Sequence, residues 1–191
     1  MRVSLLILFF AIVITTLQAQ KSVTINYTIA VSDSKEIKNA QLIINDSMSY
    51  EWFNANQKFY SKKNNPLGSM YLPHAAIKNN KSKKLYYKLK DKNKYSQFDF
   101  RDNEWQITND TITIIGYKCV KALLFVDGQK LCESYFTTEL NLIGNFLYDG
   151  LPGVVLKELC TMRDYIRTYT ATSITFEAKQ IVNIEPKDII K

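Results

Sequence analysis

The residue types that most often carry catalysis are scarce and scattered in this chain. The only histidine is His74, and the cysteines are Cys119, Cys132 and Cys160. A nucleophile needs a base beside it, but His74 lies far along the chain from every cysteine, and the nearby Ser69 has no nucleophile-elbow context. A zinc site takes three or four convergent ligands. We therefore assign no catalytic, cofactor-binding or metal-binding residue, and expect no cofactor.

Carboxylates offer the one alternative chemistry. Glu133, Glu139 and Glu158 could converge as the acid and base of a hydrolase. Their spacing does not require this, because each also suits a solvated strand position.

Positive charge is concentrated in one stretch of a chain whose formal net charge is +7. The candidate basic patch consists of Lys81, Lys83, Lys84, Lys88 and Lys90. Its partly alternating pattern indicates an edge strand, where lysines prevent unwanted pairing. The patch suits weak contact with polyanions such as acidic glycans or anionic lipid head groups. It does not favour specific nucleic-acid binding.

The clearest local signal is the turn at Gly150, Leu151, Pro152 and Gly153. Proline followed by glycine favours a type II turn, because proline fixes φ and glycine accepts the positive φ of the next position. Gly150 would permit a bulge or a close approach of another backbone segment. We predict that this turn is structural.

A hairpin is predicted where residues 117–126 and 129–138, both rich in strand-forming residues, flank Asp127-Gly128. This dipeptide is typical of a type I′ turn. The resulting register places Val126 opposite Gln129, Leu123 opposite Cys132 and Cys119 opposite Phe136. Both faces of the hairpin carry apolar residues, so we expect both to be covered, either within a sandwich or where a curved sheet wraps a cavity and is overlaid by another segment.

The same register bears on the cysteines, one pair of which should form a disulfide after export. Cys119 and Cys132 would lie about 13 Å apart along one face, whereas a disulfide requires a Cα separation below about 7 Å. Cys160 is therefore expected to pair with one of them. We choose Cys119 with Cys160.

The remaining pattern is that of a β protein. Residues 23–31 alternate between apolar and polar side chains, and further strands are predicted at 40–44, 49–53, 84–90, 97–100 and 154–159. We expect hairpins joining 105–107 to 111–115 through Asn109-Asp110, and 165–170 to 173–178, with one weak helical turn at 72–77. The predicted fold is a twisted antiparallel sheet, curved or partly closed into a barrel or sandwich, with little helix.

The first 19 residues are predicted to be a secretory signal peptide, with residues 20–191 forming one domain. Arg2 precedes an apolar run, and small residues lead to Ala19. The run is shorter than the roughly 20 residues that span a bilayer. No cysteine follows Ala19 directly, so we expect a periplasmic or secreted protein that is neither a lipoprotein nor membrane-spanning after cleavage.

Four blocks of the sequence together resemble a known family. They are residues 105–107 (Trp-Gln-Ile), 115–122, 136–140 and 150–156, the last reading Gly-Leu-Pro-Gly-Val-Val-Leu. The chain resembles the GLPGLI family of exported bacterial proteins, also called the Porph_ging domain. The resemblance implies a β-rich fold and an envelope or secreted location. It implies no catalytic residues, since the family has no established reaction.

These observations favour a non-enzymatic exported protein that binds a lipid-like ligand or an envelope protein through an apolar interior or face. Two alternatives remain open: an envelope hydrolase that uses carboxylates, and a purely structural surface module.

Overall fold

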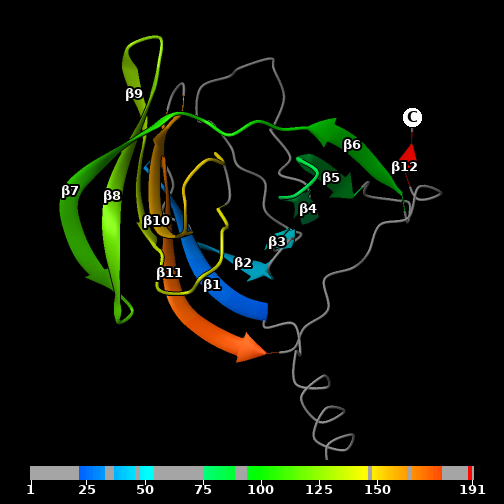
Figure 1. Ribbon diagram of the computed structural model, residues 1–191, viewed down its shortest axis with the longest axis horizontal. Coiled ribbons are helices and arrows are strands. Elements are labelled where there is room, and N and C mark those ends of the chain that lie inside the picture. Colours follow the sequence, from blue (N-terminus) through cyan, green and yellow to red (C-terminus); the bar gives the residue numbers. More distant parts are fainter. Residues whose placement is uncertain are drawn as a thin grey trace, which may run out of the picture.

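The computed structural model is built around one open β-sheet (Figure 1). The structure describes residues 22–32, 37–45, 48–53, 75–88, 94–145, 148–162, 165–177 and 189–190. In chain order, the strands are β1 (Ser22–Val31), β2 (Lys38–Ile44), β3 (Met48–Phe53), β4 (Ala75–Asn79), β5 (Lys84–Lys88), β6 (Tyr95–Asp99), β7 (Trp105–Ile114), β8 (Tyr117–Val126), β9 (Gln129–Thr137), β10 (Val154–Thr161), β11 (Ile166–Glu177) and β12 (Ile189–Ile190). No helix occurs within these ranges, and hence none there has the length and apolarity to cross a membrane.

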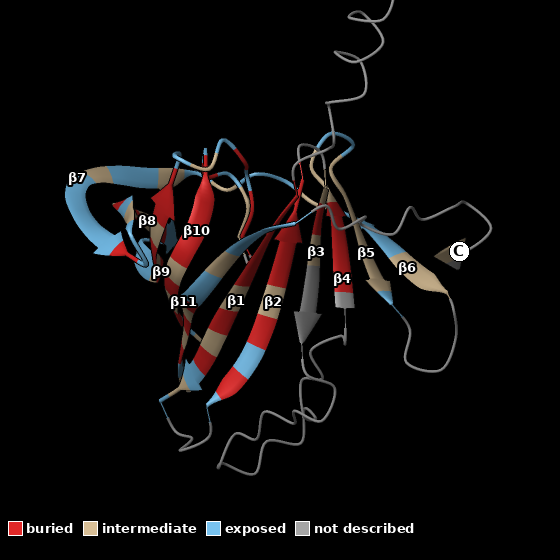
Figure 2. Ribbon diagram, turned by 90° about the horizontal axis from the view of Figure 1, so that it is seen from below, coloured by how far each residue is buried: buried red, intermediate tan, exposed pale blue. Residues whose placement is uncertain are grey.

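The strand order is β12-β6-β5-β4-β3-β2-β1-β11-β10-β9-β8-β7. All neighbours pair antiparallel except β12 and β6, which pair parallel. Strands β7 and β12 end the sheet without pairing with each other, so it does not close into a barrel. Figures 1 and 2 show the sheet twisting and curving between β7 and β6. The prediction of a mainly β, curved antiparallel sheet is confirmed.

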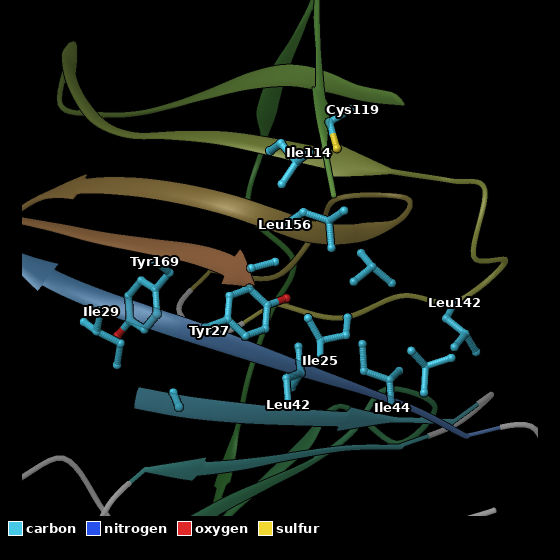
Figure 3. Close-up of a cluster of buried hydrophobic side chains, with 14 residues drawn as sticks. Ile25, Tyr27, Ile29, Leu42, Ile44, Ile114, Cys119, Leu142, Leu156 and Tyr169 are labelled. Atoms are coloured by element: carbon cyan, nitrogen blue, oxygen red, sulfur yellow. The ribbon is translucent and has the colours of Figure 1, made fainter. Parts of the chain in front are cut away.

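Strand β1 lies at the centre of the sheet and provides much of its core. Val23, Ile25, Tyr27 and Ile29 are all buried, as the alternating sequence pattern predicts. They join buried residues from β2, β10 and β11 in the largest apolar cluster, which Figure 3 shows together with Leu142. The Tyr27 hydroxyl donates a 2.5 Å hydrogen bond to the backbone carbonyl of Val155, so the core tyrosine is not left with an unsatisfied polar group.

The turn between β8 and β9 confirms the predicted hairpin. Asp127 and Gly128 have φ angles of 51° and 76°, as a type I′ turn requires. Val126 lies opposite Gln129, as expected.

Farther from the turn, the predicted register of this hairpin is wrong by one residue. Leu124, rather than Leu123, lies opposite Cys132, and Val120, rather than Cys119, lies opposite Phe136. The cause is a β-bulge, since β9 contains one extra residue between the partners of Phe125 and Leu124. Turn chemistry fixes the register only up to such a bulge.

The faces of this hairpin are covered only in part: Cys119 and Ala122 are buried, but Phe125 and Val126, next to the turn, are 38% and 48% exposed. Ala122 and Phe136 pack with Leu151 and Val155, and Trp105 contacts this cluster from the beginning of β7. The segment before β10, through Leu151, therefore helps to cover one face of the hairpin.

Two of the predicted hairpins are instead single strands with a bulge. Strand β7 continues through Asn109 and Asp110, and its register with β8 shifts between Ile107 and Thr111. Strand β11 likewise runs through residues 170–173, with its irregularity opposite Asn26 and Tyr27 of β1. Polar residues mark both places, but two extra residues in β7 and one in β11 are absorbed as bulges because pairing continues on either side.

The weak helical turn predicted at 72–77 is also wrong where the structure describes it, because residues from Ala75 onward form β4. The predicted signal peptide at 1–19, Ser69, His74 and Lys90 lie outside the described residues.

Candidate functional site

Asp149 anchors the segment between β9 and β10 to the linker that precedes β7. Its backbone carbonyl accepts hydrogen bonds from the backbone N–H of Asn103 at 2.9 Å, the Asn103 side chain at 3.1 Å and the Trp105 indole N–H at 3.1 Å. Three donors on one carbonyl hold the backbone at a fixed position. The chain then turns through Gly150 toward β10.

Gly150 is required by both its conformation and its surroundings. Its φ is 113°, and a Cβ atom there would lie 2.4 Å from the backbone oxygen of Asn103. Side chains rarely adopt this φ, and a backbone atom cannot easily move aside. The predicted close approach at Gly150 is confirmed.

Gly153 is required for a different reason than the one predicted. Its φ lies outside the left-handed region, so the type II turn assigned to Leu151, Pro152 and Gly153 is wrong. A Cβ atom at Gly153 would instead lie 2.3 Å from the carbonyl oxygen of Thr137. Leu151 is buried and Pro152 is exposed. The motif therefore provides close backbone packing on both sides of a buried leucine.

Lys78 extends from β4 to the same segment and is buried. Its ammonium group donates to the backbone carbonyl of Asn145 at 3.1 Å and to the Asn145 side-chain oxygen at 3.4 Å. It also forms an ion pair with Asp149 at 3.5 Å. A buried lysine thus connects β4, the fourth strand from the β12 edge, with the segment that leads into β10.

Burial and the neighbouring charge of Lys78 shift the pKa of the Asp149 carboxyl in opposite directions. Burial raises its pKa above the ordinary value of 3.8, while Lys78 lowers it through charge and hydrogen bonding. Asp102 raises the pKa further and Lys83 lowers it. The net direction is upward, so the loss of hydration outweighs the ion pair with Lys78.

Asp149, Asp102 and Lys83 line a pocket of about 210 Å³, whereas Lys78 is not among its lining residues. Its walls come from the turn after β4, the linker before β7 and the segment before β10; the lining residues are Asn80, Lys83, Asp102, Ile143, Gly144, Asn145, Asp149, Gly150, Leu151, Pro152 and Gly153. Lys83 and Asp102 form an exposed ion pair at 2.7 Å. The lining combines both signs of charge with two side-chain amides, and it contains no serine, threonine, cysteine or histidine among the described residues.

The predicted basic patch is partly neutralised. Lys83 pairs with Asp102, and Lys84 pairs with Asp99. Lys81 and Lys88 are exposed. Because Lys83 also lines the pocket, part of the patch belongs to this polar site. Weak polyanion contact remains a prediction.

The three glutamates do not share one catalytic face. Glu133 lies opposite Leu159 and Glu158 lies opposite Ser134, so these two side chains point to opposite faces of the sheet. Glu139 is exposed beyond the end of β9. The carboxylates that do lie together, Asp102 and Asp149, were not identified from the sequence.

The disulfide joins Cys132 to Cys160, whose Cα atoms are 4.1 Å apart. Cys160 is a partner as predicted, but the choice of Cys119 is wrong. The two cysteines lie directly opposite each other on β9 and β10, a pairing that the hairpin register alone could not indicate. Cys119 is a buried free thiol, and burial raises its pKa to about 11.

Sequence reasoning located the glycine turn but missed the charged groups around it. A signal for Lys78 was present, since this lysine follows Ala75, Ala76 and Ile77 in a short apolar strand. Asp149 directly precedes the turn. Lys83 was identified only as a member of the basic patch, and Asp102 carried no local signal, because the fold brings these two residues together from separate connections.

The fold resembles that of part of a larger solved protein. Structures of PNGF-II in the C2 and P21 space groups each match with a TM-score of 0.57 and 20% identity, over 87% of this chain. This chain shares its fold with one part of PNGF-II. It spans only 29% and 30% of the length of those two chains.

An uncharacterized conserved protein from Thermus thermophilus is less similar, with a TM-score of 0.49 and 7% identity over 90% of both chains. No protein-family model and no curated protein matches the sequence. Membership of the GLPGLI family accordingly stays a prediction. The likeness to PNGF-II concerns the fold alone.

Proposed function

We propose that the protein is an exported, non-enzymatic binding module that recognises a polar group of an envelope protein in the pocket beside Gly150 to Gly153. One observation carries the proposal. The pocket is framed by backbone that two glycines and a buried lysine hold in place, and it presents paired charges and amides. Such preorganised polar groups provide specificity at little ordering cost.

The character of the pocket favours a protein partner over a lipid-like ligand. Asp102 and Asp149 suit an ammonium group, whereas Lys83 suits a carboxylate. A protein segment that presents an ammonium group and a carboxylate would form ion pairs with these residues in place of the existing Lys83–Asp102 ion pair. The largest apolar cluster, by contrast, consists of side chains packed against one another (Figure 3).

Export is part of the proposal and has two supports. The sequence of residues 1–19 has the features of a signal peptide, and the Cys132–Cys160 disulfide suits an oxidising compartment.

Site-specific photo-cross-linking in cells tests the binding site. Ile143 lines the pocket and is 53% exposed, while Ile166 is 46% exposed and does not line it. A photoreactive residue at Ile143 should yield a discrete cross-linked envelope protein, and the matched residue at Ile166 should not. In parallel, the purified protein should leave a fluorescent fatty acid unbound. Stoichiometric fatty-acid binding without cross-linking at Ile143 would favour the apolar-ligand alternative instead.

A second candidate function, hydrolysis by carboxylates, is favoured by one specific observation. Asp102 and Asp149 line the same pocket, and the pKa of Asp149 is raised, as a general acid requires. A panel of nitrophenyl glycosides and esters distinguishes this function. Turnover by the wild type that is lost in Asp149→Asn supports a hydrolase, and a wild type inactive on the whole panel speaks for the binding module.

A further inference from the structure

The disulfide lies within a cluster of potential metal ligands. Cys132, Cys160 and Glu158 are all buried, and their sulfur and carboxylate atoms lie within 4.8 Å of one another. The cluster is formed by β9 and β10 and does not line the polar pocket. The binding function proposed above does not use it.

Strand register explains why these groups converge. Cys160 lies opposite Cys132, and Glu158 lies opposite Ser134, one pleat away on the same face. The Ser134 hydroxyl donates a 3.0 Å hydrogen bond to the Glu158 carboxylate. This bond orients the carboxylate beside the sulfur atoms, as the outer partners of metal ligands commonly do.

We propose that, once the disulfide is reduced, Cys132, Cys160 and Glu158 bind a zinc ion. Thiolates and a carboxylate are ordinary zinc ligands, and a water molecule can complete the tetrahedral site. A single buried thiol or carboxylate would not suffice. Here three ligand atoms are already close together in the folded chain.

A dithiol can reduce the Cys132–Cys160 disulfide. The sulfur–sulfur bond breaks and accepts two electrons and two protons, giving two thiols, while the dithiol is oxidised to its own disulfide. Zinc then displaces the two thiol protons to solvent. The same two strands stay cross-linked, first by a covalent bond and afterwards by the metal ion.

The charges around the cluster are compatible with this exchange. Two thiolates and one carboxylate carry three negative charges, and a divalent ion neutralises two of them. The third can be balanced by the guanidinium of Arg167, which is buried and lies opposite Cys160 on the adjacent strand β11. A buried site without net charge avoids most of the cost of burying ions.

Cobalt binding by the full chain after reduction tests the proposal. A phosphine reductant is suitable because a dithiol would itself bind the ion. Under anaerobic conditions, Co²⁺ should produce a thiolate-to-cobalt absorption band at one ion per chain, and excess Zn²⁺ should remove it. The oxidised chain should show no band.

Variants assign the ligands. Cys132→Ser and Cys160→Ser should each abolish the band, and Glu158→Gln should weaken affinity by at least about tenfold. Cys119→Ser is the matched control, since it removes the third thiol, which is also buried, and it should leave the band unchanged. If reduction unfolds the chain, Co²⁺ should restore its β-sheet circular dichroism. A reduced chain that binds no cobalt, whether folded or not, or whose band depends on Cys119, would overturn the proposal.

Discussion

Gly150 and Gly153 show that two neighbouring glycines can be needed for different physical reasons. Gly150 combines a positive φ with contact to the Asn103 backbone, whereas Gly153 needs only the missing Cβ atom. Because the obstructing atoms belong to backbone, neither site can relax by moving a flexible side chain. The glycines therefore set how closely the segment before β10 approaches the sheet.

Gly153→Ala should consequently lower the free energy of unfolding by about 2 kcal/mol, in the range of overpacked sites. Pro152→Ala is the matched control, since Pro152 is exposed, and it should cost less than about 1 kcal/mol. Urea unfolding of the two variants measures the difference. Equal stability of the two variants would mean that the close approach to the Thr137 carbonyl does not exclude a side chain at position 153.

Asp149 should make stability depend on pH. Its folded-state pKa is raised above the ordinary 3.8, so in the interval between the two pKa values the folded state binds more protons than the unfolded chain. The contribution of this group to the free energy of unfolding therefore falls as pH rises through that interval. Asp149→Asn should remove this decline, whereas Asp102→Asn should reduce it only slightly. If the free energies of unfolding of the wild type and of Asp149→Asn changed with pH in parallel, the decline would not come from Asp149.

Cys119 should be unreactive in the folded state. It is buried, and its pKa is raised to about 11, so little thiolate exists near neutral pH. Iodoacetamide at mildly alkaline pH should modify Cys119 only at the rate of unfolding. Rapid alkylation of the native protein would show that the thiol is accessible.

Strands β9 and β10 are joined by a disulfide that encloses the segment carrying the glycine turn. The two cysteines are separated by 28 positions, so loop-closure entropy predicts a stabilisation of about 3.6 kcal/mol. The simultaneous replacement of Cys132 and Cys160 by alanine should lower stability by this amount, measured by denaturant unfolding without metal. Cys119→Ala is the comparison variant. A smaller loss for the double variant than for Cys119→Ala would show that the cross-link does not hold this segment.

Much of the element structure could be predicted from the sequence, because local chemistry determines it. Alternation defined β1, and Asp127-Gly128 defined the turn between β8 and β9. The errors in register and in two hairpins occurred at bulges; in β9, for example, one extra residue moved Cys132 from Leu123 to Leu124. Periodicity and turn type do not report such insertions, since a bulge is stabilised by pairing on both of its sides.

At the scale of the whole molecule, the open curved sheet places charged residues from separate connections in one pocket. The glycine motif could be found in the sequence, but its surroundings could not, because Lys78, Lys83 and Asp102 reach it only through the order of strands in the sheet. Likeness to a part of PNGF-II supports the same arrangement of strands as a recurring fold. It adds nothing about the occupant of the pocket.

The measurement that tests the binding site most directly combines cross-linking at Ile143 with reversal of one charge. Lys83 and Lys84 are neighbours, and each pairs with an aspartate, but only Lys83 lines the pocket. Lys83→Glu should reduce the cross-linked product at least about tenfold, the effect of losing one charge-assisted contact of about 1.4 kcal/mol. Lys84→Glu should leave the yield unchanged. Equal yields from both variants, or an equal loss in both, would contradict recognition in the pocket.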